Sequence, residues 1–144
     1  MNVLVAVDLS DVSRKMLDAV LRIPRPEGMK VVIVHVAEPD PEFVGWDAGP
    51  GVVRDAVAAE FHRERHEVEA MATELREGGV DAVGLVVQGP TVTTILDEIE
   101  RREADLLVVG SHGHGAAYDL TVGSISSGVI RKSTVPVLVI PDRT

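Results

Sequence analysis

The stretch VLVAVDLSDVSRKMLDAVLRI, residues 3–23, contains the unit from which the fold is built. Val3 to Val7 form an uninterrupted apolar run, which is typical of a parallel strand buried on both faces. Ser10 follows as the N-cap, and apolar residues then recur at helical spacing until Pro24 stops the helix. These helical positions are Val12, Met16, Ala19, Val20 and Ile23. The stretch therefore predicts a strand followed by an amphipathic helix.

The same unit recurs along the rest of the chain. Continuous apolar runs predict four more strands, at Val31–Val36, Ala82–Val87, Leu106–Val109 and Val137–Ile140. Helical spacing predicts a long helix from about Val53 to the Gly78-Gly79 C-cap. Its apolar stripe, which only Glu64 interrupts, consists of Val57, Phe61, Val68, Met71, Ala72 and Leu75. The same spacing predicts a helix with Val92, Ile95, Leu96 and Ile99, and one with Ile125, Val129 and Ile130. Glu38 to Gly51, rich in proline and glycine, is predicted to be a loop. Alternation of this kind predicts an α/β fold, an open five-stranded parallel sheet with helices on both faces.

Composition limits the class of protein. The chain has 144 residues, of which 45% are hydrophobic and 26% are charged, so one globular domain over 1–144 is expected. No apolar run approaches the ~18 residues of a membrane span, and no basic region precedes the first apolar stretch, which predicts a cytoplasmic protein. Because the sequence contains no cysteine, disulfides and thiolate chemistry are excluded.

The charge balance limits the classes of ligand that the protein can bind. With 14 basic and 23 acidic residues the formal net charge is -9, which disfavours a general nucleic-acid surface. An anionic ligand must then be held by local devices such as helix N-termini, backbone N–H groups or a bound cation.

The segments that follow the predicted strands are candidates for the site, because open α/β sheets bind ligands beyond the carboxyl ends of their strands. After the first four strands these are Asp8–Ser10, Ala37–Glu38, Gln88–Pro90 and Gly110–Gly115. In the last of them, glycines let backbone N–H groups approach an anion, and Gly123 to Ser126 open a helix whose positive end faces it. This combination predicts a phosphate-binding loop.

Gly110, Gly113 and Gly123-Ser124 stand in the spacing G-x2-G-x9-G-[ST], which resembles the nucleotide-binding signature of the universal stress protein family. Val3 to Asp8, Val34 to Val36 and Gly123 to Ile140 extend the resemblance over essentially the whole chain. The resemblance implies a Rossmann-like fold of the adenine nucleotide alpha hydrolase-like type, ATP binding and a homodimer. The chain departs from the family's usual Asp-Gly-Ser turn, because Leu9 stands in place of the glycine and makes the turn bulkier.

The resemblance also implies roles for individual residues. Asp8 and Val36 would hold the adenine side and the ribose, Asp8 would orient Mg²⁺ through water, and further nucleotide contacts would come from both glycine segments. The full predicted nucleotide-binding set is Ala6, Val7, Asp8, Val36, Val109, Gly110, Ser111, Gly113, Gly123, Ser124, Ile125 and Ser126. ATP and Mg²⁺ are the expected cofactors, and no site with protein metal ligands is predicted.

Several of the candidate residues can also be explained by a purely structural role. Asp8 is as well explained as a cap of the first helix, and His112 with His114 lacks an evident third metal ligand. His62 and His66 belong to a charged, solvated helix face. Ser111, Ser124 and Ser126 lack the base and orienting acid that a nucleophile needs.

The leading functional interpretation is an ATP-binding regulatory protein of the stress response, in which the nucleotide sets conformation or the choice of an unknown regulatory partner. The alternatives are a slow ATP hydrolase or autophosphorylating enzyme and a nucleotide-independent dimeric scaffold. A dedicated enzyme is disfavoured because the glycine motif contains no evident base, lysine or arginine. The apolar strand Val137 to Ile140 is predicted to be an exposed edge through which the homodimer forms.

Overall fold

The computed structural model describes residues 1–37, 50–111 and 122–142 of the chain. Strands and helices alternate along it from β1 to β5. The strands are β1 (Asn2–Val7), β2 (Lys30–Ala37), β3 (Asp81–Gln88), β4 (Leu106–Gly110) and β5 (Val137–Ile140). The helices are α1 (Asp11–Arg22), α2 (Pro50–Glu77), α3 (Thr91–Arg101) and α4 (Ser124–Lys132).

All five strands form one parallel sheet in the order β3-β2-β1-β4-β5. Central β1 pairs with β2 on one side and with β4 on the other, so that Val3 lies between Val31 and Leu106. The predicted α/β fold with five parallel strands is therefore confirmed. Its strands read as continuous apolar runs because both faces of the sheet are covered.

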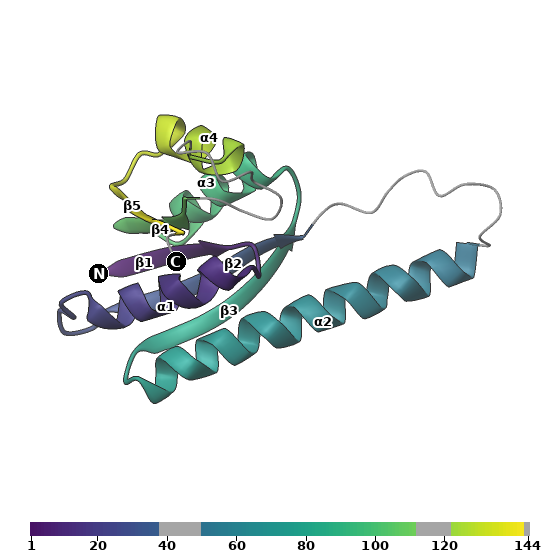
Figure 1. Ribbon diagram of the computed structural model, residues 1–144, viewed down its shortest axis with the longest axis horizontal. Coiled ribbons are helices and arrows are strands. Elements are labelled where there is room, and N and C mark those ends of the chain that lie inside the picture. The colour runs from purple at the N-terminus through teal and green to yellow at the C-terminus, as the bar shows by residue number, and fades with distance from the viewer. Residues whose placement is uncertain (38–49, 112–121, 143–144) are drawn as a thin grey trace.

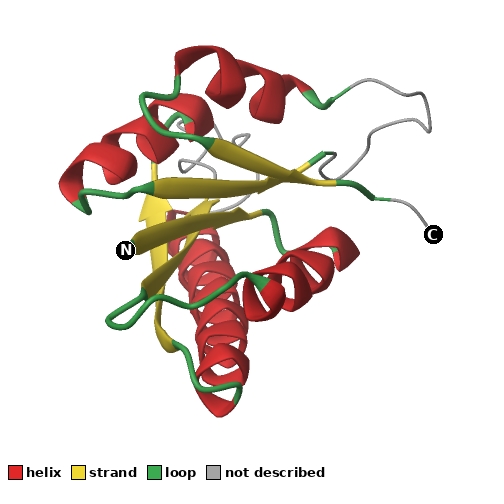
Figure 2. Cartoon of the chain, turned by 90° about the vertical axis from the view of Figure 1, so that its left-hand side faces the viewer, coloured by secondary structure: helices red, strands yellow, loops and turns green. Residues whose placement is uncertain are grey.

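Helices α1 and α2 cover one face of the sheet, and α3 and α4 cover the other (Figures 1 and 2). Successive residues of β1 alternate between the two resulting cores: Val3 and Val5 pack with α1 and α2, and Leu4 packs with α3 and α4. The first core includes Met16, Leu17, Val68 and Leu75, and the second includes Ile95, Ile99 and Val129. The helical stripes seen in the sequence supply both sets.

The order of the strands reverses between β1 and β4. The chain first adds β2 and β3 on one side of β1, and then returns to add β4 and β5 on the other side. Ala6 and Val109 are register partners near the carboxyl ends of β1 and β4. In open α/β sheets ligands bind at such a reversal, so the segments that follow β1 and β4 define the candidate site.

Most strands extend by one residue beyond the predicted bounds, and one helix begins earlier than predicted. Helix α2 begins at Pro50, not near Val53, so the end of the predicted loop Glu38–Gly51 is helical, and 38–49 lie outside the described residues. Strand β4 extends to Gly110. In Figure 1 the N-terminal part of α2 projects beyond the sheet. Among the described helices, none combines the length and the hydrophobicity that crossing a bilayer requires.

Candidate functional site

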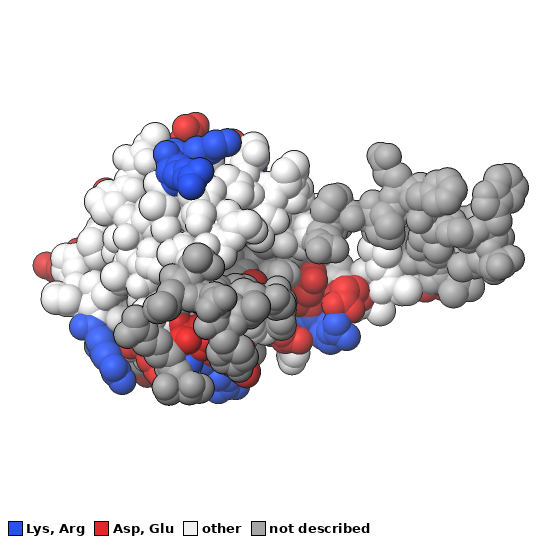
Figure 3. All heavy atoms as spheres, turned by 45° about the horizontal axis from the view of Figure 1, so that its top comes forward, with Lys and Arg blue, Asp and Glu red and all other residues white. Residues whose placement is uncertain are grey.

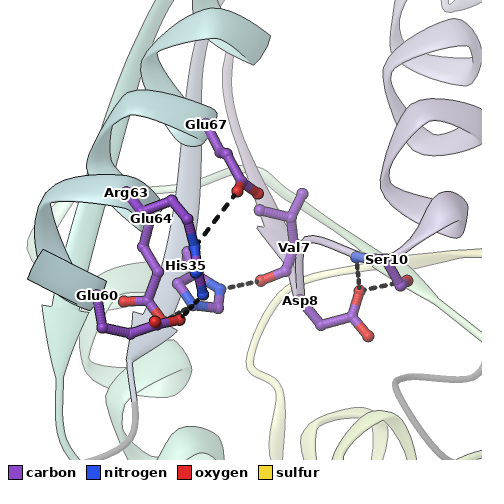
Figure 4. A network of polar contacts seen from close by, with 8 residues as sticks. All are labelled: Val7, Asp8, Ser10, His35, Glu60, Arg63, Glu64 and Glu67. Atoms are coloured by element: carbon purple, nitrogen blue, oxygen red, sulfur yellow. Dashed lines mark hydrogen bonds and ion pairs between the residues drawn. The ribbon is translucent and has the colours of Figure 1, made fainter. Parts of the chain in front are cut away.

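Asp8 is fixed at the carboxyl end of β1 by the first turn of α1 (Figure 4). Its Oδ1 accepts hydrogen bonds from the Ser10 hydroxyl at 2.6 Å, the Ser10 backbone N–H at 3.1 Å and the Ser13 hydroxyl at 3.4 Å. Ser10 does occupy the N-cap position of α1, but it makes no side-chain cap. The expectation that the Ser10 hydroxyl caps the helix is therefore wrong, because this hydroxyl donates to the neighbouring carboxylate.

The residue between these two partners has an unusual backbone. Leu9 has a φ of 63°, in the left-handed region that glycine adopts readily and leucine does not. Its side chain is half-buried and packs against the core on the α1–α2 face. The turn after β1 thus keeps the backbone of a glycine turn although the residue is leucine.

His35 holds the end of β1 from the neighbouring strand (Figure 4). Its Nδ1 lies 3.0 Å from the Val7 carbonyl oxygen, and since a carbonyl only accepts, Nδ1 donates this hydrogen bond. Its Nε2 lies 3.4 Å from Oε1 of Glu64 on α2, and both side chains are largely buried. Glu64, the interruption in the apolar stripe of α2, therefore faces a polar partner on β2 instead of the core.

Ser111 connects the end of β4 to β5 and α4. Its N–H donates to the Ile140 carbonyl at 2.8 Å, and its own carbonyl accepts the N–H of Gly123 at 2.8 Å. Its hydroxyl oxygen accepts the backbone N–H of Asp142 at 2.9 Å. Nearby, the Ser126 hydroxyl donates to the Gly110 carbonyl at 2.7 Å. The predicted residues Gly110, Ser111, Gly123 and Ser126 are thus brought together.

The N-terminus of α4 opens at this edge. Gly123 is the N-cap residue and has no side chain that could cap the helix. In the described part of the chain, the backbone N–H groups of Ser124, Ile125 and Ser126 meet no acceptor. Such N–H groups, together with the helix dipole, favour an anion.

Aliphatic residues line one side of the reversal point. Ala6, Val36 and Val109 belong to the core on the α3–α4 face, with Ala6 and Val36 only partly buried. Val7 is buried in the core on the opposite face, so its side chain does not join this group. Ile125 is 46% exposed at the start of α4. Gly113, His112 and His114 lie outside the described residues.

Sequence reasoning missed one charged pair at this edge. The Lys15 Nζ on α1 lies 2.7 Å from Oδ1 of Asp142, just beyond β5. The rule on carboxyl ends of strands would have found Asp142 had the segment after the fifth strand been considered with the other four. Lys15 carries no such signal, because it lies within a helix and not in a segment that follows a strand.

The charged side chains elsewhere in the described residues do not form a second candidate site. The residues that the structure describes include no group of three or more His, Asp or Glu side chains placed to hold a metal ion. On the face drawn in Figure 3, the Lys and Arg side chains form small separate groups beside acidic ones, with no continuous basic patch. His62 and His66 are exposed on α2, where Arg63 pairs with Glu60 and Glu67.

Comparison with known proteins points to one family. The model of the universal stress protein family matches residues 1–141. The chain is 30% identical over 146 residues to the universal stress protein YxiE of Bacillus subtilis, and this alignment covers 96% of the chain and 97% of the relative.

Solved structures share the fold at lower identity. The structure of MJ0577 from Methanocaldococcus jannaschii matches with a TM-score of 0.84 at 22% identity, covering 99% of this chain and 96% of that one. A family protein of Arabidopsis thaliana, solved with AMP bound, matches with a TM-score of 0.71 at 22% identity over 100% and 93% of the two chains. A universal stress protein in complex with cAMP matches with a TM-score of 0.67 at 23% identity over 98% and 96%.

Proposed function

The chain belongs to the universal stress protein family, and from this premise we propose that it is an adenine-nucleotide-binding regulatory protein. One observation carries the proposal: the Ser111 carbonyl accepts the N–H of Gly123 at the N-terminus of α4, beside β1, the strand that Asp8 follows. Fold neighbours solved with AMP and with cAMP support an adenine nucleotide as the ligand.

The base and the ribose are assigned to the β1 side of the reversal point. Ala6 and Val36 offer a partly exposed aliphatic surface beside the buried Val109, which suits the flat apolar face of a purine. Asp8, whose carboxylate is oriented by Ser10, is the acceptor for ribose hydroxyls. Val7 contributes its backbone, because its side chain lies in the other core.

The phosphates are assigned to the segment from Gly110 to Ser111 and to the first turn of α4. The N–H groups of Ser124, Ile125 and Ser126 are the donors there, and Gly123 leaves room for close approach of a phosphate oxygen. Gly113 remains a predicted member of this cradle.

We propose ATP as the physiological nucleotide and Mg²⁺ as its counterion. A helix N-terminus supplies only about half a unit of positive charge, far less than a triphosphate requires. The described residues present no cluster of protein ligands for a metal, so the phosphates would hold Mg²⁺, with Asp8 orienting it through water. Titration calorimetry with and without Mg²⁺ tests this: equal affinities in both would remove the cation from the site.

The geometry favours binding over chemistry. In the cradle, the Ser126 hydroxyl donates to the Gly110 carbonyl, and the Ser111 hydroxyl accepts the backbone N–H of Asp142, so both hydroxyls serve the backbone. We therefore propose that the nucleotide acts as a conformational or partner-selecting ligand. Release of stoichiometric ADP from Mg-ATP on a timescale of seconds would instead support the hydrolase.

The deciding experiment identifies the nucleotide that purified protein releases on denaturation, by chromatography and mass spectrometry, and measures its affinity. Gly123→Val should reduce affinity more than about tenfold without unfolding the domain, because its side chain fills the approach to the cradle and not the core. Absence of any released or added adenine nucleotide would favour the nucleotide-independent scaffold.

A further inference from the structure

The pair formed by Lys15 and Asp142 lies next to the proposed phosphate cradle. Lys15 projects from α1, and its Nζ is 2.7 Å from Oδ1 of Asp142. The backbone N–H of the same Asp142 donates to the Ser111 hydroxyl at 2.9 Å. Asp142 thus links the ammonium group of Lys15 to Ser111, the first residue after β4.

Ser111 makes this proximity relevant to phosphate. Its carbonyl holds the N–H of Gly123, the N-cap residue of α4, and its N–H is bound by Ile140 at the end of β5. The end of β5 and the N-terminus of α4 therefore meet at Ser111, and Lys15 is connected to it through Asp142. Among the described residues, Lys15 is the cationic side chain that is connected to this edge by contacts, first with Asp142 and then with Ser111.

The other cations near these elements are poorly placed. Arg14 is exposed on α1 and has no ion pair in the described part of the chain. Arg131 and Lys132 lie in the last turn of α4, about 12 Å along the helix axis from its N-terminus. Among the described lysines and arginines of α1 and α4, Lys15 is therefore the one that contacts connect to Ser111, through Asp142.

The ion pair with Asp142 does not prevent a contact between Lys15 and a phosphate. The side chains of Lys15 and Asp142 are 36% and 40% exposed, and ion pairs at this exposure are weak because water screens them. A phosphate oxygen with more negative charge than a carboxylate competes well for the same ammonium group. Exchange of one anionic partner for another needs no change in the fold.

We propose that Lys15 is a phosphate-chain ligand, and that nucleoside di- and triphosphates displace the Asp142 carboxylate from it. The inference rests on the proposed nucleotide site and adds a preference to it. The α-phosphate is held by the N-terminus of α4, and the phosphates beyond it reach Lys15. Lys15 thus distinguishes ADP and ATP from AMP.

The test measures the affinities of AMP, Mg-ADP and Mg-ATP for four proteins by calorimetry: wild type, Lys15→Ala, Asp142→Asn and Arg14→Ala. Lys15→Ala should weaken Mg-ATP and Mg-ADP about tenfold and AMP less than about twofold. Asp142→Asn should tighten Mg-ATP, because it removes the competing carboxylate and retains the backbone N–H to Ser111. Arg14→Ala is the matched control, since it removes the same charge from the neighbouring exposed position and should leave all three affinities within about twofold.

Thermal melting of each variant shows that the fold is retained, and Lys15→Arg should keep most of the ATP affinity because it keeps the charge. Equal losses in Lys15→Ala and Arg14→Ala, or an equal loss for AMP and ATP, would overturn the inference and leave the nucleotide site standing. If wild type binds none of the three nucleotides, the proposed function and the inference both fall.

Discussion

Leu9 has a backbone conformation that is energetically unfavourable for any residue with a β-carbon. A left-handed φ of 63° costs an L-residue with a β-carbon about 1 to 2 kcal/mol relative to the right-handed region. Two features hold it there: the bonds from Ser10 to Asp8 on one side, and the packing of its own side chain against the core on the α1–α2 face. The resemblance to the family predicted a bulkier turn at Leu9, but the sign of φ depends on those contacts and could not be predicted.

Substitution of Leu9 should reverse the usual ranking of alanine and glycine. Leu9→Ala loses the side-chain packing and keeps the left-handed strain, whereas Leu9→Gly loses the packing and the strain together. We expect Leu9→Gly to be more stable than Leu9→Ala by about 1 kcal/mol in urea unfolding. If Leu9→Ala proves equally or more stable, the turn does not adopt a left-handed φ in solution.

At the scale of elements, α2 is attached to the sheet by a polar contact as well as an apolar one. The apolar stripe of α2 predicted its buried face, with Glu64 as an interruption. Glu64 meets His35 of β2, and that histidine also holds the Val7 carbonyl. Periodicity indicates which residues share a helix face, but not which strand that face contacts. The pairing of Glu64 with His35 therefore could not be predicted from the sequence.

A double-mutant cycle measures this pair. His35→Ala, Glu64→Ala and the double variant should give a coupling free energy of about 1 kcal/mol, because both side chains are largely shielded from water. The pair of Glu60 and Arg63 on the exposed side of the same helix is the control, with an expected coupling of about 0.3 to 0.5 kcal/mol. Equal couplings in the two cycles would contradict a special role for His35 and Glu64.

The apolar contact of α2 with the sheet depends on a glycine. A β-carbon at Gly84 of β3 would lie 2.8 Å from Val68 Cγ1 and 2.9 Å from the Val68 carbonyl oxygen, so the helix backbone would have to move. Gly84→Ala should therefore lower the free energy of unfolding by about 1 to 3 kcal/mol.

The neighbouring residue provides the control for Gly84. Val83 is 50% exposed on the same strand, and Val83→Thr should change the free energy of unfolding by less than about 0.5 kcal/mol. Chemical unfolding of both variants makes the comparison. An unchanged stability of Gly84→Ala would mean that α2 sits farther from β3 than the structure places it.

At the scale of the whole molecule, the fold could be predicted because its strands are continuous apolar runs separated by clear helical stripes. Val3–Val7 and Val31–Val36 are examples, and β1 and β2 do pair. The edge proposed to carry the nucleotide site was predicted from the general rule for open α/β sheets. The pair of Lys15 and Asp142 could not be predicted, because its members are 127 residues apart and no periodicity relates them.

Strand β5 is an edge strand, as expected, and its four residues are only partly buried. An apolar edge of this kind tends to be paired or covered. We expect a homodimer that forms through β5, with sedimentation velocity at micromolar concentration as the measurement. A monomer under these conditions would contradict the prediction.

The bonds of Ser111 have a consequence for such a dimer. Because its N–H and its hydroxyl are both hydrogen-bonded to the segment Ile140–Asp142, a ligand that moved Ser111 would also move the edge through which we expect a second subunit to pair. Communication of this kind is reciprocal: the factor by which a nucleotide strengthens self-association equals the factor by which self-association strengthens nucleotide binding. Dilution of the protein should then lower its affinity for the nucleotide. The concentration of the protein in the cell would thereby affect how much nucleotide it binds.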